Sequence, residues 1–406
     1  MRDYDYIIVG GGLAAASAVD GIREVDSDGS IVMLSEETEP PYHRPPLSKE
    51  YLQSEDAPRD LLYIKPETWV EDARLELRTE TSVVGLEPRG LTVTTSHDEV
   101  LRAGRILLAT GGRPRDLDLP GRELAGIQTY RTVEDAETLR SMAAKAGRVA
   151  LIGGGFIGME LAASLTTLDV RPIVIELEDR VWWSLFPPEI SSFMRHYFEE
   201  RGVEFRLGRS VEAFRGDDIL ETVVLDDGAH LACDLAVIGV GISPADSLAT
   251  AAGMAVQDGI MIDEFGETSH AHIYASGDVA CFPDPVFEDL GRVEHWDHAK
   301  AHGRLVGRNM AGEREPYEHV SYFFTNVFDL SINVFGRPES ADQLVLSGEL
   351  GSRRSVIYCG AEGRLVGTIM VNAPETLEEN RELMRRRPSM DDLEPEPGPE
   401  VGELVG

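Results

Sequence analysis

Hydrophobic and polar positions repeat one βαβ pattern twice along this chain, about 143 residues apart when counted from Gly10 to Gly153. Each copy has a short apolar run, a glycine-rich turn, a helix-length amphipathic stretch and a second apolar run, a combination that predicts buried strands around a helix. The segments of the first copy are Tyr6–Val9, Gly10–Gly12, Leu13–Val25 and Ile31–Leu34. Those of the second are Val149–Ile152, Gly153–Gly155, Phe156–Leu168 and Ile173–Ile175.

A third region shows a different pattern. Aromatic and β-branched strand candidates precede a charged helix, and no glycine fingerprint accompanies them. The strand candidates are Tyr322–Phe324, Ser331–Phe335, Arg354–Tyr358 and Leu365–Val371, the helix is Pro374–Arg386, and a further helix is expected over Asp135–Ala146. From Pro388 onward the chain has prolines and acids but no basic residue, which is typical of a disordered tail.

These patterns predict an α/β fold with two Rossmann-type dinucleotide-binding domains and a C-terminal α+β interface domain. We expect a first nucleotide domain over residues 1–114 and 242–316, with a second one over 115–241 inserted in it, the arrangement implied by the family resemblance described below. The interface domain is expected over 317–387 and the acidic disordered tail over 388–406.

Composition narrows the class of protein. A net charge of −34 disfavours nucleic acid as a partner. Three cysteines without a CxxC pair argue against a disulfide framework, a zinc site or a dithiol centre, and we expect no metal. Neither a signal peptide nor an apolar run of about 18 residues is evident, so the expected location is the cytoplasm. The basic residues are 34 arginines and only four lysines (Lys49, Lys65, Lys145 and Lys300), a bias that either a salt-rich cytoplasm or a GC-rich genome explains.

The first glycine turn has the sequence required to bind a pyrophosphate. Gly10 makes the tight turn, Gly12 lets the backbone approach the phosphates, and Ala15 allows close packing of helix and strand. Glu36, or Glu37 beside it, ends the next strand and is expected to accept the adenosine ribose hydroxyls.

The second turn repeats this design with Gly153, Gly155 and Gly158. Glu176 ends its second strand, and a carboxylate there accepts a free 2′-hydroxyl and repels a 2′-phosphate. This favours NADH over NADPH, although Arg180 is also positioned to bind a phosphate. Gly241 is expected in the same nucleotide site.

Two further strands end in turns that distinguish the two sites. Leu107–Gly112 ends in Thr110 and Gly111, and Ile273–Asp278 ends in Gly-Asp. Asp278 is expected to cap the next helix and to accept a ribityl hydroxyl; a capping role alone is the alternative.

At these residues the chain resembles the FAD/NAD pyridine-nucleotide oxidoreductases, and within them the ferredoxin/rubredoxin-reductase branch with its apoptosis-inducing-factor-like and monodehydroascorbate-reductase-like relatives. The resemblance covers nearly the whole chain except the tail and implies a glutathione-reductase-like fold. It is carried by Pro41–Lys49, Ala109–Pro114, Gly153–Glu160, Gly277–Asp278 and Arg292–Ala299.

The resemblance implies that NADH gives hydride to FAD, which passes electrons to a ferredoxin or rubredoxin. It places Arg44 and Lys49 beside the isoalloxazine. It places Glu160, in the first turn of the second glycine-turn helix, near the nicotinamide and paired with Lys49. Trp296 flanks the flavin pyrimidine, with a core position as the alternative, and a helix from about Asp297 points its N-terminus at N1/O2. The catalytic residues expected are therefore Lys49 and Glu160, while His295 and His298 are interpreted as cap or packing residues.

The sequence also departs from the family. No cysteine precedes Cys233, so thiol-relayed chemistry is disfavoured. Thr325-Asn326 stands where the family has Ser-Asp, which puts the acceptor in doubt. Two alternatives therefore stay open, namely an oxidoreductase acting directly on a quinone, radical or oxygen, and an apoptosis-inducing-factor-like redox sensor. For an acidic ferredoxin we expect a local arginine patch that includes Arg113, Arg115 and Arg292, with apolar docking at high salt as the alternative.

Overall fold

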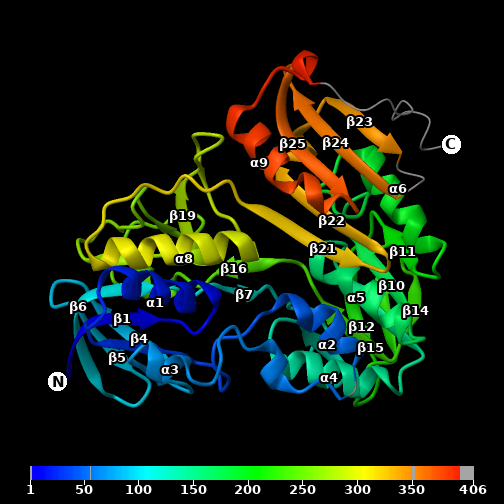
Figure 1. Cartoon of the computed structure of the whole chain (residues 1–406). Helices are drawn as coiled ribbons and strands as arrows, with labels where there is room; N and C mark the ends of the chain where they lie inside the picture. The colour runs from blue at the N-terminus through cyan, green and yellow to red at the C-terminus, as the bar shows by residue number, and fades with distance from the viewer. Residues whose placement is uncertain (1, 55, 350–352, 394–406) are drawn as a thin grey trace. The chain divides into compact units, whose positions relative to one another are not determined.

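The computed structural model describes residues 2–54, 56–349 and 353–393 (Figure 1). The chain forms two compact units. The first contains residues up to His43 together with Pro58–Arg113 and Ser243–Ser321. The second contains Arg44–Ala57, Pro114–Ile242 and the chain from Tyr322 onward. No helix within these described ranges has both the length and the apolar character needed to cross a bilayer.

A seven-stranded sheet forms the centre of the first unit, in the order β3-β2-β1-β6-β5-β4, with β18 paired to β6. Its central strand β1 (Arg2–Val9) runs parallel to β2 (Ile31–Leu34) and β6 (Val100–Leu108). Ile7, Ile8 and Val9 are buried, as expected for a strand covered on both faces. The other strands are β3 (Leu75–Arg78), β4 (Val83–Glu87), β5 (Thr92–Thr95) and β18 (Ile273–Ala275).

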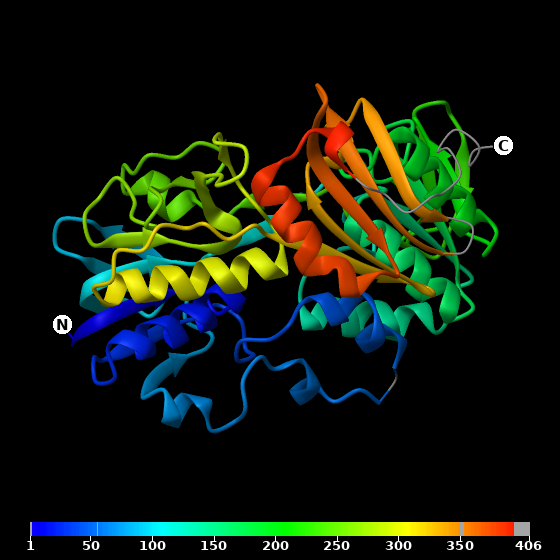
Figure 2. The same cartoon turned by 45° about the horizontal axis from the view of Figure 1, so that its top comes forward.

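Helices α1 (Leu13–Val25) and α8 (Trp296–Ala311) pack together in this unit at unusually short range (Figures 1 and 2). A Cβ added at Gly303 would lie 2.3 Å from the carbonyl oxygen of Ala14, and one at Gly307 would lie 2.1 Å from that of Ala18. Only glycine allows two backbones to approach this closely. The small residues of both helices therefore fix how they cross.

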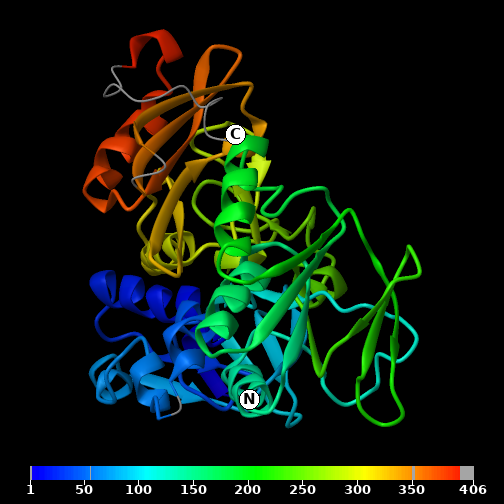
Figure 3. The same cartoon turned by 90° about the vertical axis from the view of Figure 1, so that its right-hand side faces the viewer.

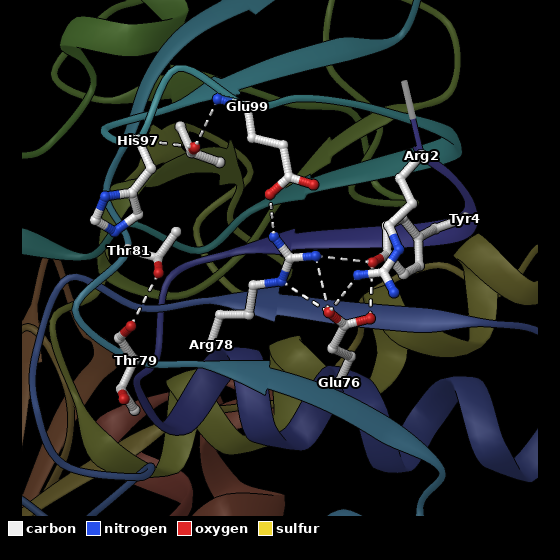
Figure 4. Close-up of polar contacts among 9 residues, drawn as sticks. Arg2, Tyr4, Glu76, Arg78, Thr79, Thr81, His97 and Glu99 are labelled. Carbon is white, nitrogen blue, oxygen red and sulfur yellow. Dashed lines mark hydrogen bonds and ion pairs between the residues drawn. The ribbon is translucent and has the colours of Figure 1, made fainter.

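A polar network joins the ends of several strands of the first unit (Figure 4). The Arg78 guanidinium lies 2.8 Å from Glu76 and 2.6 Å from Glu99, while the Tyr4 hydroxyl donates to Glu76 over 2.7 Å. The remaining elements of this unit are η2 (Arg59–Leu62), α3 (Trp69–Asp72), α7 (Ser247–Ala251), β17 (Ile260–Met261), η3 (Gly277–Val279), β19 (Ala280–Pro283) and β20 (Leu290–Gly291). The chain leaves and re-enters the unit through β7 (Gly112–Pro114) and β16 (Ile242–Pro244).

The second unit contains the other parallel sheet, in the order β11-β10-β9-β15-β8, and a three-stranded antiparallel sheet (Figure 3). The parallel strands are β8 (Ile127–Thr129), β9 (Arg148–Ile152), β10 (Arg171–Glu176), β11 (Glu204–Leu207) and β15 (Leu235–Ile238). The antiparallel strands are β12 (Val211–Arg215), β13 (Thr222–Leu225) and β14 (His230–Ala232). The helices are η1 (Pro45–Ser48), α2 (Glu50–Gln53), α4 (Val133–Ala143), α5 (Phe156–Thr167) and α6 (Pro188–Glu199).

The C-terminal part of this unit is an antiparallel sheet in the order β21-β22-β25-β24-β23, and α9 (Leu377–Arg386) packs against β22 and β25 (Figure 2). Its strands are β21 (Tyr322–Val327), β22 (Leu330–Gly336), β23 (Gln343–Glu349), β24 (Arg354–Ala361) and β25 (Arg364–Val371). Short helices η4 (Pro338–Ser340), η5 (Pro374–Thr376) and η6 (Met390–Asp392) complete it.

The units differ from the expected domains in two respects. Residues 44–57, expected in the first nucleotide domain, belong to the second unit, where the expected second nucleotide domain and interface domain are also found. The expected disordered tail begins with six described residues, which include η6, while residues 394–406 of that tail lie outside the described residues.

Candidate active site

The first glycine turn has the geometry that a pyrophosphate requires. Gly10 has φ +125°, and a Cβ there would lie 2.2 Å from the Ala109 carbonyl oxygen, so no other residue fits. Gly12 is the N-cap of α1, has no side-chain cap, and a Cβ there would have no neighbour within 4 Å. Ala15 is fully buried. The free backbone N–H groups of this helix N-terminus are thus open to an anion.

The second turn repeats this geometry at α5. Gly153 has φ +109° and lies against the Gly239 backbone, and a Cβ at Gly158 would lie 1.9 Å from the Gly153 carbonyl oxygen. Gly155 is the uncapped N-cap of α5 with open space around its Cα. Gly241, with φ +94°, is also open. Both turns therefore fit the phosphates of a dinucleotide.

The acids that follow the two turns differ in environment. Glu36 is exposed and pairs with Arg113 over 2.8 Å, whereas Glu37 accepts the Tyr42 hydroxyl over 2.6 Å. Glu176 is buried and accepts the backbone N–H of Gly154 over 2.5 Å and that of Glu178 over 2.9 Å. A carboxylate has about four acceptor positions, so Glu176 keeps capacity for ribose hydroxyls while it holds the turn.

The turns that end β6 and β18 are partly as expected. The Thr110 hydroxyl donates to the Ala245 carbonyl over 2.8 Å, and Gly111 has φ +64°. Asp278 is not the N-cap residue of α8, and a capping contact from its side chain to that helix stays a prediction. Asp278 lies in the 3₁₀ turn η3, the strand β19 follows it, and the N-cap of α8 is His295.

Trp296 opens α8, and its indole N–H donates to His43 Nδ1 over 3.0 Å. Lys300, one turn later, lies 5.1 Å from the centre of the Trp296 ring. Trp296 is only partly buried, so it is not a plain core residue. His298 is fully buried, with its Nδ1 2.9 Å from the Tyr317 hydroxyl and its ring stacked on Phe282, which is the packing role expected for it.

Three polar side chains meet around Glu160 inside the second unit. The Lys49 ammonium lies 2.6 Å from Glu160 Oε1, with 10% and 7% of the two side chains exposed. The Thr325 hydroxyl donates to the same oxygen over 2.7 Å, and the Ser48 hydroxyl donates to Oε2. Glu160 is the fifth residue of α5, so the expectation that it lies in the first turn is wrong.

The segment that carries Lys49 is held on the second unit by hydrogen bonds from several directions. The Tyr130 hydroxyl donates to the Leu47 carbonyl over 2.6 Å, and the Ser164 hydroxyl donates to the Ser48 carbonyl over 2.7 Å. Arg44 donates to the Arg131 carbonyl over 2.9 Å. Burial raises the pKa of Tyr130 well above its usual range, so its hydroxyl stays a donor. The backbone around Lys49 is therefore rigidly placed.

Sequence reasoning missed Ser48, Tyr130 and Ser164 as parts of this site, and it treated Thr325 only as a departure from the family's Ser-Asp pair. Thr325 is in fact fully buried and bonded to Glu160, while its neighbour Asn326 is exposed. One signal was available, because a hydroxyl among apolar neighbours on a strand needs a buried partner.

The structure also bears on the expected arginine patch and on the three cysteines. The Arg292 side chain is only 8% exposed and pairs with Asp258 and Glu294, so it does not belong to an exposed arginine patch. Cys233, Cys281 and Cys359 are free and buried, and burial raises the pKa of each thiol, that of Cys233 to about 11. In the part of the chain that the structure describes, no group of three or more His, Cys, Asp or Glu side chains is arranged to hold a metal ion.

Comparison with known proteins gives consistent matches over nearly the whole chain. The model of the pyridine nucleotide-disulphide oxidoreductase family matches residues 4–303, and the reductase C-terminal model matches residues 322–394.

Individual relatives are similar at full length. The probable ferredoxin reductase CtmF of Castellaniella defragrans is 34% identical over 94% of this chain and 93% of its own. The rubredoxin-NAD(+) reductase of Ectopseudomonas oleovorans is 30% identical over 91% of this chain and 96% of its own. Among solved structures, the covalent putidaredoxin reductase-putidaredoxin complex matches with a TM-score of 0.92 and 28% identity, over 100% of this chain and 99% of that chain.

Proposed function

The chain belongs to the pyridine nucleotide-disulphide oxidoreductase family, and on this basis we propose that it is an FAD-containing enzyme that oxidises NADH and reduces a ferredoxin or rubredoxin. The observation that carries the proposal is the joint presence of two open glycine turns and the buried Lys49–Glu160 pair. The two glycine turns account for two dinucleotides, and the Lys49–Glu160 pair supplies a fixed cation for redox chemistry.

We assign FAD to the turn of the first unit. Gly10 and Gly12 would bind its pyrophosphate, Thr110, Gly111 and Asp278 would line its path, and Trp296 would border the ring. The open backbone at Gly12 supports this assignment, because the N-cap residue of α1 has no side chain that could occupy the first backbone N–H groups of the helix. When bound, the flavin supplies the chemistry of accepting a hydride and releasing electrons singly.

We assign NADH to the second turn, through Gly153, Gly155, Gly158 and Gly241. Glu176 would accept the free 2′-hydroxyl of the adenosine ribose and repel a 2′-phosphate. Arg180 is next to Asp179, 3.4 Å away, which weakens it as a phosphate ligand. NADH is therefore the proposed donor.

Lys49, and Arg44 in the same segment, would lie at the flavin ring, and Glu160 would orient the nicotinamide amide. A fixed ammonium favours the more negative, reduced form of a flavin beside it. The pair with Glu160 restricts where that ammonium lies, because both side chains are nearly excluded from water.

The acceptor and the location are part of the same proposal. The three free cysteines suit a reducing compartment, and we keep the cytoplasm as the expected location. At a net charge of −34, and with Arg113 and Arg292 paired to acids, repulsion opposes an acidic ferredoxin in dilute buffer. We therefore favour docking of the ferredoxin through apolar contacts, at salt concentrations that screen the charge repulsion, over docking on an arginine patch.

Stopped-flow reoxidation tests the proposal. Protein reduced by NADH is mixed with ferredoxin, rubredoxin, a quinone or oxygen, at salt concentrations from low to high. We expect fast reoxidation by one of the iron proteins, with a rate that climbs as salt screens the repulsion. Fast reaction with quinone or oxygen alone would identify a small-acceptor enzyme, and slow reaction with everything a redox sensor. A rate that falls with salt would restore the arginine patch.

A further inference from the structure

Strand β21 presents one buried face on which a single residue is polar. Phe323, Thr325 and Val327 alternate with more exposed neighbours, and their exposed fractions are 6%, 0% and 1%. In a strand, residues two apart share a face, so the Thr325 hydroxyl points the same way as the two apolar side chains. A hydroxyl buried there destabilises the fold unless it finds a partner.

The partner of the Thr325 hydroxyl is the carboxylate of Glu160, which lies on α5 in the same unit. The Thr325 hydroxyl donates to Oε1 over 2.7 Å, the oxygen that also faces Lys49, while Ser48 donates to Oε2. Three donors from two separate segments, Ser48-Lys49 and β21, thus hold one carboxylate. With both oxygens engaged, rotation of the Glu160 carboxylate breaks at least one bond.

Aromatic contacts anchor β21 on both sides of Thr325. Two residues before it, Phe323 meets Phe156 of α5 edge to face at 4.8 Å. Three residues after it, Phe328 meets Phe198 of α6 at 5.1 Å. Phe328 has φ +53° because it begins the two-residue turn between β21 and β22, in which Val327 pairs with Leu330. The strand is therefore fixed where its hydroxyl meets Glu160.

We infer that Thr325 is a positioning residue for the Lys49–Glu160 pair, through which the C-terminal sheet controls the orientation and charge of the redox site. The inference rests on the proposed function of that pair. Without the hydroxyl, Lys49 becomes the sole partner of Oε1, so the carboxylate draws the ammonium more strongly. Less positive charge then remains for a reduced flavin.

The test compares Thr325→Val with two controls. Thr325→Ser keeps the hydroxyl, and Thr368→Val makes the same substitution at another fully buried threonine of the C-terminal sheet. The Thr368 hydroxyl has no hydrogen-bond partner among the described residues. For Thr325→Val we expect the limiting rate of reduction by NADH to fall about 10-fold, as for a lost bond to a charged group. The Kd for NADH stays within about threefold, and the flavin midpoint potential becomes more negative.

Thr325→Ser should restore both the rate and the potential, and Thr368→Val should leave both unchanged. The inference is overturned if Thr325→Val matches Thr368→Val, or if Thr325→Ser is as impaired as Thr325→Val, since packing would then explain the effect. A urea-unfolding cycle of Thr325→Val with Glu160→Gln, on the holoprotein, should show non-additive effects, and additivity would refute the coupling. If the wild type is not reduced by NADH, the proposed function fails, while this cycle still tests the contact.

Discussion

Replacing Lys49 by methionine should destabilise the protein far more than the same change at another ion-paired lysine. Removing one member of a buried ion pair costs about 3–5 kcal/mol. Both side chains here are nearly buried, but the Ser48 and Thr325 hydroxyls continue to solvate Glu160, so we expect the lower end, about 3 kcal/mol. Lys65, whose pair with Asp20 is 23% and 36% exposed, is the matched control, and Lys65→Met should cost at most about 1 kcal/mol.

Urea unfolding of the two holoprotein variants measures this difference, and stopped-flow reduction by NADH measures the chemical role. Lys49→Met should retain FAD but be reduced about 10²–10³-fold more slowly, by analogy with the loss of a preorganised donor, and its flavin potential should be lower. Lys65→Met should be reduced by NADH at the wild-type rate. Equal unfolding midpoints for the two variants would refute the energetic reasoning, and equal reduction kinetics would remove Lys49 from the site.

Three further outcomes are expected. Glu176→Ala should lose most of the preference for NADH over NADPH, measured as the ratio of kcat/KM values; an unchanged ratio would show that this carboxylate does not select the donor. Replacing all three cysteines by serine should leave the rate of NADH-dependent reduction of an artificial acceptor within a few-fold of wild type, because the buried thiols stay protonated. A loss of about 100-fold in that rate, with FAD retained, would reveal a thiol relay. Burial lowers the pKa of His302 to about 3 and lowers that of His298 well below its usual value. Below about pH 6.5 the unfolded chain therefore binds more protons than the folded chain. The free energy of unfolding should then fall by up to ~1.4 kcal/mol per pH unit for each histidine as the pH drops from there. Urea midpoints between pH 7.5 and 5.5 check this, with His302→Gln expected to flatten the dependence and a change at the exposed His230 expected to leave it intact.

Local signals in the sequence predicted the elements that carry strong periodicity. The helix Leu13–Val25 and the strand Ile31–Leu34 have the expected bounds, because glycines and polar residues delimit both. The strand Gln343–Glu349 was missed, since it lies at the edge of the C-terminal sheet and lacks a clear alternation of buried and exposed positions.

Parts of the site that depend on long-range contacts were beyond local reasoning. Thr325 and Glu160 are 165 positions apart, and no pattern around either residue specifies that they meet. The same holds for Tyr130, whose hydroxyl reaches the Leu47 carbonyl across 83 positions. By contrast, the glycine turns were recognisable, because their backbone geometry is encoded within a few consecutive residues.

Pairing of β18 with β6 has a consequence for the synthesis of this protein. The partners of Ile106 and Leu108 in that strand are Ile273 and Ala275, so translation must continue for 165 residues, from 108 to 273, before this edge of the sheet is covered. At about 5–20 residues per second, that interval lasts roughly 8–33 s. During it, three buried residues of β6 and the face of α1 that contains Ala14 and Ala18 are without their final partners. The nascent chain is thus exposed to mispairing at this edge until β18 has emerged from the ribosome.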